Sequence, residues 1–359
     1  MSDIPIFIFW EDAMKAIIKT KPGPGNVELV DVPVPGIAET EVLIKVRAMG
    51  ICGSDILIID GDMDANVPII LGHEFSGEIV EKGSKVTHFS IGDRVASELS
   101  IQSCRWCVDC RRGDFHLCAN RRAPGIHMNG VFTEYIALPE FSLHKIPDNI
   151  SYEEGAVMEP AAVAAHGVLE RALIQPEDFV VIIGPGTIGL LALQMVMHYG
   201  AKKVVVAGKE NDMHLRLLTA QELGADRIIN VDRENIEDIV FEMTDGRGAD
   251  LVVDCAGTQS AIYEGIQVLK KHGRLCTMGM PGEIEIGIPW KKAIFRDMDL
   301  IFSYSSSASS WNIVRSMLER GAINVKPLIT HRESFSNYQI VLDDATKGNV
   351  IKAILFHES

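Results

Sequence analysis

The chain of 359 residues is long enough for two domains, and its 47% hydrophobic content supplies a core for both. The formal net charge of −15 excludes nucleic acid or an anionic membrane surface as the main partner, because both bind proteins through basic surfaces. We therefore expect an acidic globular enzyme that acts on a small molecule.

The N-terminal apolar run is too short to cross a membrane. It extends from Ile4 to Trp10, follows no basic segment and runs directly into Glu11 and Asp12. It predicts neither a signal peptide nor a transmembrane helix. Three cysteines are scattered through the chain and indicate no disulfide framework: Cys52, Cys255 and Cys276. We expect a cytoplasmic protein.

The first part of the chain, to about residue 160, predicts short strands separated by turns. Glycine and proline interrupt it repeatedly, as is typical of a mostly β, barrel-like domain. The β-prone runs are Val42 to Val46, Ile69 to Leu71, Gly77 to Val80 and Val131 to Ala137.

Three motifs in this part and just after it contain residue types that zinc accepts. They are Gly50-Ile-Cys52-Gly-Ser-Asp55, Gly72-His73-Glu74 and Met158-Glu159-Pro160. A catalytic zinc needs three or four such ligands and one free position. Spacing alone does not bring the motifs together. Each residue taken singly also fits a structural role, such as a small core cysteine, a histidine bonded to backbone or an acid at a helix start.

Four cysteines within fifteen residues indicate a second metal site. The run Cys-x-x-Cys-x-x-Cys-x7-Cys comprises Cys104, Cys107, Cys110 and Cys118. Zinc binds four thiolates tetrahedrally, and a short polar lobe cannot bury enough surface to order itself otherwise. The alternative is a pair of disulfides, which the intracellular character of the chain disfavours. We interpret the run as a structural zinc site.

From about residue 164 the pattern changes to apolar strands that alternate with helices. Continuous apolar runs separated by helices predict an α/β fold with a doubly wound parallel sheet. The expected elements are Phe179 to Ile183, Ile188 to Tyr199, Lys203 to Ala207, His214 to Leu223, Arg227 to Asn230, Leu251 to Asp254 and Arg274 to Met278.

The turn Gly184-Pro-Gly186-Thr-Ile-Gly189 follows the first of these strands and opens the first helix. In this context the glycines permit a tight turn, let a pyrophosphate approach the backbone and let helix and strand pack closely. The helix N-terminus then offers unpaired N–H groups to the phosphates. The motif predicts dinucleotide binding, against the alternative of a structural glycine turn.

The end of the second strand bears on which nicotinamide cofactor is used. An acid that grips the adenosine ribose is expected here, yet Gly208 occupies the position and Lys209 follows it. This favours NADP(H) over NAD(H). In the alternative reading Lys209 is a solvated lysine, Glu210 contacts the ribose and NAD(H) is usable.

The motifs around Cys52, His73 and Glu159, the four-cysteine run and the glycine turn at Gly184 make a set of five. Their order along the chain resembles that of the zinc-dependent medium-chain alcohol dehydrogenases. The chain is most similar to the sorbitol, L-iditol and threonine dehydrogenase branch, from about Met14 to the C-terminus. The resemblance implies a GroES-like β-barrel catalytic domain (1–163 and 305–359) and a Rossmann cofactor domain (164–304). It also implies a homodimer or homotetramer.

The resemblance implies roles for individual residues. Cys52, His73 and Glu159 would hold the catalytic zinc, with Glu74 ranked just below them as a direct or exchanging ligand. Ser54 would begin the proton relay, although Leu57 stands where many relatives have the next histidine. The cofactor would contact Gly184, Gly186, Thr187, Ile188, Gly189, Gly208 and Lys209.

In such enzymes zinc makes an alcohol hydroxyl more acidic, so that a hydride can leave for the nicotinamide. Polyol relatives carry Phe-Arg-Tyr where this chain has Phe302-Ser303-Tyr304, so the polyol signature is incomplete. We expect a polyol, a sugar-derived alcohol or a hydroxy acid, with a threonine-type amino alcohol as the alternative. A non-enzymatic zinc- and nucleotide-binding scaffold and a zinc hydrolase or lyase are disfavoured, because the ligand set and the dinucleotide motif are both present.

Overall fold

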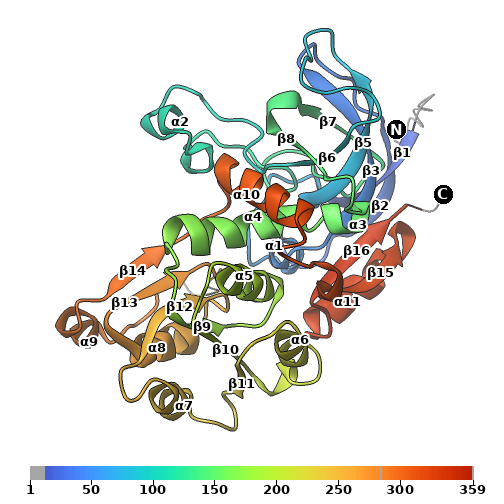
Figure 1. Ribbon diagram of the computed structural model, residues 1–359. Helices are drawn as coiled ribbons and strands as arrows, with labels where there is room; N and C mark the ends of the chain where they lie inside the picture. The colour runs from blue at the N-terminus through green and yellow to red at the C-terminus, as the bar shows by residue number, and fades with distance from the viewer. Residues whose placement is uncertain (1–12, 281, 283–284, 358–359) are drawn as a thin grey trace.

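The computed structural model describes residues 13–280, 282 and 285–357. Two units, each built on β-sheet, lie on either side of helices α4 (Met158–Ala165) and α10 (Ala308–Glu319), as Figure 1 shows. The predicted Ile4 to Trp10 run lies outside the described residues. No helix in the described part is long and apolar enough to cross a bilayer.

The first unit contains two sheets built largely from the N-terminal half of the chain. The smaller sheet has the order β2-β1-β4, and the larger has the order β15-β16-β3-β5-β6-β8, with β7 paired to β3. The strands are β1 (Ala13–Lys19), β2 (Val27–Pro33), β3 (Glu41–Gly50), β4 (Ile69–Ile70), β5 (Glu74–Lys82), β6 (Arg94–Ser97), β7 (Tyr135–Pro139), β8 (Leu143–Lys145), β15 (Ile329–Ser334) and β16 (Lys352–Phe356).

The predicted strand from Val131 to Ala137 begins only at Tyr135. The backbone N–H groups of Val131 and Phe132 instead bond to the carbonyls of Gly72 and Leu71. These two residues lie outside the strand ladder, because their N–H groups bond to the turn that precedes β5.

The second unit is a six-stranded parallel sheet in the order β11-β10-β9-β12-β13-β14. This order reverses between β9 and β12, which is the arrangement of dinucleotide-binding sheets. The predicted doubly wound fold is confirmed. The strands are β9 (Phe179–Ile183), β10 (Lys203–Gly208), β11 (Arg227–Asn230), β12 (Ala249–Asp254), β13 (Leu269–Thr277) and β14 (Asp299–Phe302), and the intervening helices are α5 (Thr187–His198), α6 (Arg216–Glu222), α7 (Ile236–Met243) and α8 (Gln259–Val268).

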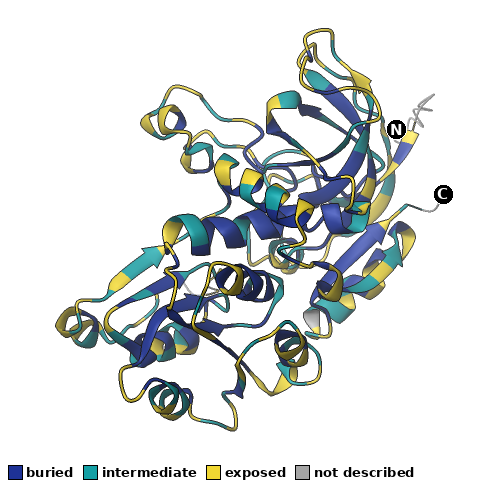
Figure 2. Ribbon diagram, in the orientation of Figure 1, coloured by how far each residue is buried: buried dark blue, intermediate teal, exposed yellow. Residues whose placement is uncertain are grey.

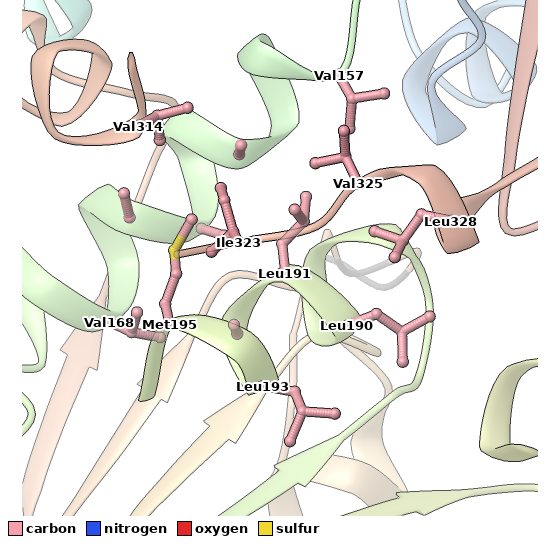
Figure 3. Close-up of a cluster of buried hydrophobic side chains, with 14 of the residues drawn as sticks. Val157, Val168, Leu190, Leu191, Leu193, Met195, Val314, Ile323, Val325 and Leu328 are labelled. Carbon is pink, nitrogen blue, oxygen red and sulfur yellow. The ribbon is translucent and has the colours of Figure 1, made fainter. Parts of the chain in front are cut away.

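A continuous core joins the two units through α4. Figure 2 shows this helix buried along most of its length, and four of its eight residues are alanines, which let neighbouring helices approach closely. Figure 3 shows α5 leucines beside side chains from the segments after α10. Because it is packed on both sides, α4 holds Glu159 in a fixed position between the sheets. The cluster includes Val157, Val168, Leu190, Leu191, Met195, Val314, Ile323, Val325 and Leu328.

The C-terminal segment returns to the first unit after the parallel sheet is complete. Strand β16 pairs with β3 and with β15, so the last strand of the chain lies beside one of the first. The predicted domain limits at residues 163, 164, 304 and 305 stay a prediction.

Candidate metal and cofactor sites

Cys52 lies at the point where β3 gives way to helix α1 (Gly53–Asp60). It is the N-cap residue of that helix, and the Asp55 carboxylate accepts a hydrogen bond of 2.9 Å from the Cys52 N–H. The carboxylate therefore closes the first turn of the helix. This turn fixes the direction in which the Cys52 side chain leaves the backbone.

Gly72 turns the chain so that His73 and Glu74 enter β5 beside the end of β3. Its φ is +85°, and a Cβ at this position would lie 2.2 Å from the Phe132 ring. Opposite, Gly50 is paired with Glu74 in the β3–β5 ladder, and a Cβ on Gly50 would lie 2.2 Å from Glu74 Oε2. Two glycines thus make the space that these side chains occupy.

The three motif residues converge. Ligand atoms of Cys52, His73 and Glu74 lie within 4.8 Å of one another, and both His73 and Glu74 are buried. Sulfur, imidazole nitrogen and carboxylate oxygen form a donor set that suits zinc. The chemistry of the residues therefore fits the metal that the sequence predicts.

Two neighbours orient the His73 ring. Its Nδ1 lies 3.4 Å from Asp55 Oδ1, and its Nε2 lies 3.5 Å from Ser54 Oγ. Burial lowers the pKa of His73, but the Asp55 carboxylate and Cys52 outweigh it and raise that pKa well above its ordinary value. A carboxylate behind a ligating histidine is a common arrangement at zinc sites.

Glu74 has a partner that the sequence analysis missed. Lys352 Nζ donates to Glu74 Oε2 at 2.7 Å, to Oε1 at 2.9 Å and to the Ile51 carbonyl at 2.9 Å. Burial lowers the pKa of Lys352, but the opposing effect of Glu74 and Cys52 is larger. The pKa of Lys352 therefore lies above its ordinary value. The available signal was a lysine in an otherwise apolar strand, which calls for a buried counter-charge.

Glu159 lies near this group but is not part of it. Its carboxylate belongs to α4, and among the described residues the converging ligand atoms are those of Cys52, His73 and Glu74 only. Burial raises the pKa of Glu159 to about 7; His73 lowers it and Glu74 raises it. The Glu159 carboxyl is therefore buried within electrostatic reach of His73 and Glu74.

The four predicted lobe cysteines also converge, with their Sγ atoms within 4.8 Å of one another and no disulfide between them. Backbone N–H groups of residues 104, 107 and 110 point at the sulfurs of Cys118, Cys104 and Cys107. The Cys107 and Trp106 N–H groups lower the pKa of Cys104 to about 6, while burial raises the pKa of Cys110 to about 11. A divalent cation is the charge that would let all four ionise.

The glycine turn after β9 has the geometry that the motif requires. Gly184 has a φ of +100°, Gly186 has open space around it, and a Cβ on Gly189 would lie 2.1 Å from the Gly184 carbonyl oxygen. Gly186 caps α5 without a side-chain hydrogen bond, so the first N–H groups of the helix are available to bind a phosphate. Ile188 is half-buried against the core, and Thr187 donates to the Ile351 carbonyl at 2.6 Å, which ties α5 to the returning C-terminal segment.

A second feature of the same sheet edge is a cavity of about 460 Å³ at the start of α8. Dinucleotides bind at the carboxyl ends of the strands in this class of sheet, so its position is that expected for part of a cofactor. It is lined by Thr258, Gln259, Ser260, Tyr263 and Glu264.

The residues at the end of β10 are packed more closely than the sequence suggests. A Cβ on Gly208 would lie 2.8 Å from the Pro185 ring, so only glycine fits without adjustment. Glu210 bonds to Asn230 at 2.6 Å and pairs with Arg233. Lys209 is exposed, and its charge reaches Glu264 beside the cavity.

Comparison with known proteins identifies both units. A family profile described as the alcohol dehydrogenase GroES-like domain matches residues 38–148, and one described as zinc-binding dehydrogenase matches residues 187–320. The sorbitol dehydrogenase of Halalkalibacterium halodurans is 37% identical over 95% of this chain and 99% of its own length. The D-arabitol-phosphate dehydrogenase of Enterococcus avium is 35% identical over 95% of this chain and 97% of its own.

Two further comparisons extend this likeness. The L-threonine 3-dehydrogenase of Shewanella pealeana is 35% identical over 95% of this chain and 99% of its own. The solved structure of a zinc-binding dehydrogenase from Sinorhizobium meliloti 1021, bound to NADP, superimposes with a TM-score of 0.88 at 28% identity and covers 96% of this chain and 100% of that one.

Proposed function

This chain belongs to the zinc-dependent medium-chain alcohol dehydrogenase family, and we propose from that premise that it exchanges a hydride between a nicotinamide cofactor and a secondary alcohol of the polyol, sugar-derived or hydroxy-acid class. The observation that carries the proposal is the buried convergence of Cys52, His73 and Glu74, in the same molecule as a complete glycine turn at the head of α5. Zinc, when bound, supplies a Lewis acid that makes the alcohol more acidic, and the nicotinamide accepts the hydride.

Residues of the chain would bind the metal and transfer the proton. Cys52 and His73 hold the metal, and Glu74 and the nearby Glu159 supply the carboxylates that complete or exchange in its shell. Ser54, whose Oγ lies 3.5 Å from the His73 ring, receives the proton that the alcohol loses. Leu57 provides no group that can take the proton onward, so the next step requires water or another side chain.

The test is an activity panel with purified, zinc-loaded protein. Sorbitol, D-arabitol, D-arabitol 1-phosphate, an aldonate and L-threonine are offered with each oxidised cofactor, and the reduced nicotinamide is followed by its absorbance. We expect turnover of polyol-type substrates above that of threonine. If neither cofactor is reduced with any of these alcohols, the proposal is contradicted.

We also propose that the cysteine lobe holds a closed structural zinc. Cys107→Ser removes one of four thiolates and the acceptor of the Cys110 N–H, so we expect loss of one zinc per chain and a Tm lower by several degrees. Metal analysis and thermal unfolding measure both. Exposed Ser260→Ala is the control and should change neither. A Cys107→Ser protein that keeps its full zinc content would disprove the assignment.

For the cofactor, we propose NADP(H) over NAD(H). Gly208 cannot present a carboxylate to the ribose, Glu210 is engaged by Asn230 and Arg233, and Lys209 is an exposed cation at the strand end. Lys209→Ala should lower the ratio of kcat/KM for NADP⁺ to that for NAD⁺ by about tenfold, since one ammonium-to-phosphate contact is lost. Lys203→Ala, at the opposite end of β10, is the matched control. A wild-type ratio below one would reverse the proposal and favour Glu210 as the ribose ligand.

We propose further that two copies of the chain associate through the edge of the parallel sheet. Strand β14 is an edge strand, and large apolar side chains near it are exposed: Trp290 (62%), Phe295 (75%) and Phe302 (72%). An unpaired strand edge with apolar neighbours is an association surface. The mass of the protein in solution tests this, because a monomer at micromolar concentration contradicts it.

A further inference from the structure

Arg121 links the two units of the molecule through hydroxyl groups. It lies three residues after Cys118, in the first unit, and its Nη1 donates to the Tyr304 hydroxyl at 2.8 Å. Its Nη2 donates to Ser305 Oγ at 3.0 Å. Tyr304 and Ser305 follow Ser303, the first residue after β14 of the second unit, so this guanidinium lies at the junction between the units.

The charge of Arg121 has no carboxylate partner within the described residues. Its Nε is buried and has no hydrogen-bond acceptor there either. A guanidinium that is partly withdrawn from water and bonded only to neutral hydroxyls lacks a counter-ion, which is costly unless a ligand provides one. The arginines that do pair with an acid in the described structure are Arg47, Arg216, Arg227, Arg233, Arg274 and Arg332.

Two more buried polar atoms without hydrogen-bond partners in the described structure belong to the segments that this link joins. One is Ser303 Oγ, on the residue before Tyr304, and the other is Nδ1 of His116, five residues before Arg121. Buried polar atoms are rarely left unpaired, so several together indicate an absent partner.

Arg121 also lies within electrostatic reach of the candidate catalytic metal site. Its charge opposes the effect of burial on the pKa of Glu159, and Lys352 and His73 act on the same carboxyl in the same direction. The guanidinium and the metal-binding group are therefore parts of one region, although they come from different segments of the chain.

We infer that Arg121, with Ser303, Tyr304 and Ser305, forms a subsite for an anionic end of the substrate, a phosphate or a carboxylate. The planar fork of arginine matches the oxygens of both groups, and the hydroxyls add hydrogen-bond donors. The inference rests on the proposed function, because it requires the alcohol end of the same substrate to lie at Cys52 and His73.

The experiment compares charged and uncharged versions of one carbon skeleton. D-arabitol 1-phosphate, D-arabitol and D-arabinonate are assayed with wild type, Arg121→Gln, Arg121→Lys and Arg122→Gln. In wild type the charged substrate should have the higher kcat/KM. Arg121→Gln should lower the charged-to-uncharged ratio of kcat/KM on the order of a hundredfold, mainly through KM. Arg121→Lys should lower it about tenfold, because lysine keeps the charge and loses the fork.

Arg122→Gln is the matched control. Arg122 is exposed, carries the same charge one residue away and donates to the His127 carbonyl at 2.7 Å. It should leave the ratio unchanged. A loss confined to the phosphate ester assigns a phosphate site and one confined to the aldonate assigns a carboxylate site, and either supports the subsite.

Other outcomes separate the subsite from the proposed function. If wild type oxidises D-arabitol but Arg121→Gln lowers kcat/KM equally for charged and uncharged substrates, Arg121 is only a link between the units and the inference is overturned. If no alcohol reacts, the proposed function fails, and the subsite is then judged by thermal stabilisation of the zinc-loaded protein by inorganic phosphate. Stabilisation that Arg121→Gln abolishes supports it, and equal effects on both proteins overturn it.

Discussion

His73→Ala should lower kcat/KM for alcohol oxidation on the order of a thousandfold or more. The imidazole supplies one of the three ligand atoms that converge at this site among the described residues, and its removal leaves a sulfur and a carboxylate that already bonds to Lys352. Without the metal, nothing at the site stabilises the negative charge that develops on the alcohol oxygen. Cofactor binding should change little, because the glycine turn and α5 belong to the other unit.

Steady-state kinetics, zinc content and cofactor titration together check this expectation. Asp55→Asn should have a smaller effect, about 10- to 100-fold, since Asp55 touches the ring and not the metal position. His198→Ala is the matched control, because His198 is exposed at the end of α5 and should leave all three measurements unchanged. Full activity in His73→Ala would show that the reaction occurs elsewhere.

Lys352→Met should destabilise the protein by about 3–5 kcal/mol, because it strands the buried Glu74 carboxylate without a counter-charge. Both side chains are almost wholly buried, with 4% and 1% of their surfaces exposed. Thermal and urea unfolding measure the loss, and Tm should fall by about 4–7 °C. The double variant Lys352→Met/Glu74→Gln should recover part of the stability, because it removes the uncompensated charge.

The pH dependence of this effect has a defined sign. Since the folded pKa of Lys352 lies above its ordinary value of 10.5, the stabilisation is fully present below pH 10.5 and is lost only as the pH rises through the folded pKa. Because Lys352 also acts on Glu159, whose pKa is about 7, the difference between wild type and Lys352→Met should be constant only above that pKa, between about pH 8 and 9. A Lys352→Met protein that unfolds at the wild-type temperature across this range would contradict the assigned role of the ion pair.

The features that could be predicted from the sequence are those that local residue patterns determine. Continuous apolar runs located β9, β10 and β11 nearly to the residue, and the glycine spacing located the turn at Gly184. Both signals arise within a dozen residues, where backbone sterics and periodicity act directly. The segment from Val131 to Glu134 was wrongly predicted as continuous strand, because the N–H groups of Val131 and Phe132 bond to the turn before β5 and only isolated bonds join the segment to β1 and β3.

Contacts between distant segments explain what was missed at the site. Glu74 and Lys352 are separated by 278 residues, and Arg121 and Tyr304 by 183. No periodicity links such positions, because the fold alone brings them together. The sequence analysis ranked Glu159 above Glu74 as a zinc ligand, whereas the structure groups Glu74 with Cys52 and His73 and sets Glu159 beside the group on α4.

The pairing of Glu74 with Lys352 also bears on how the chain matures during its synthesis. Lys352 lies on β16, the last strand of the described chain, and it meets β3, which emerges from the ribosome some 300 residues earlier. The whole parallel sheet is made in the interval and can fold as a unit meanwhile. Until β16 has been made, Glu74 lacks the Lys352 ammonium and β3 lacks its pairing with β16. We therefore expect a truncation that removes β16 to leave Glu74 without its counter-charge, while Cys52 and His73 keep the local turns that direct their side chains.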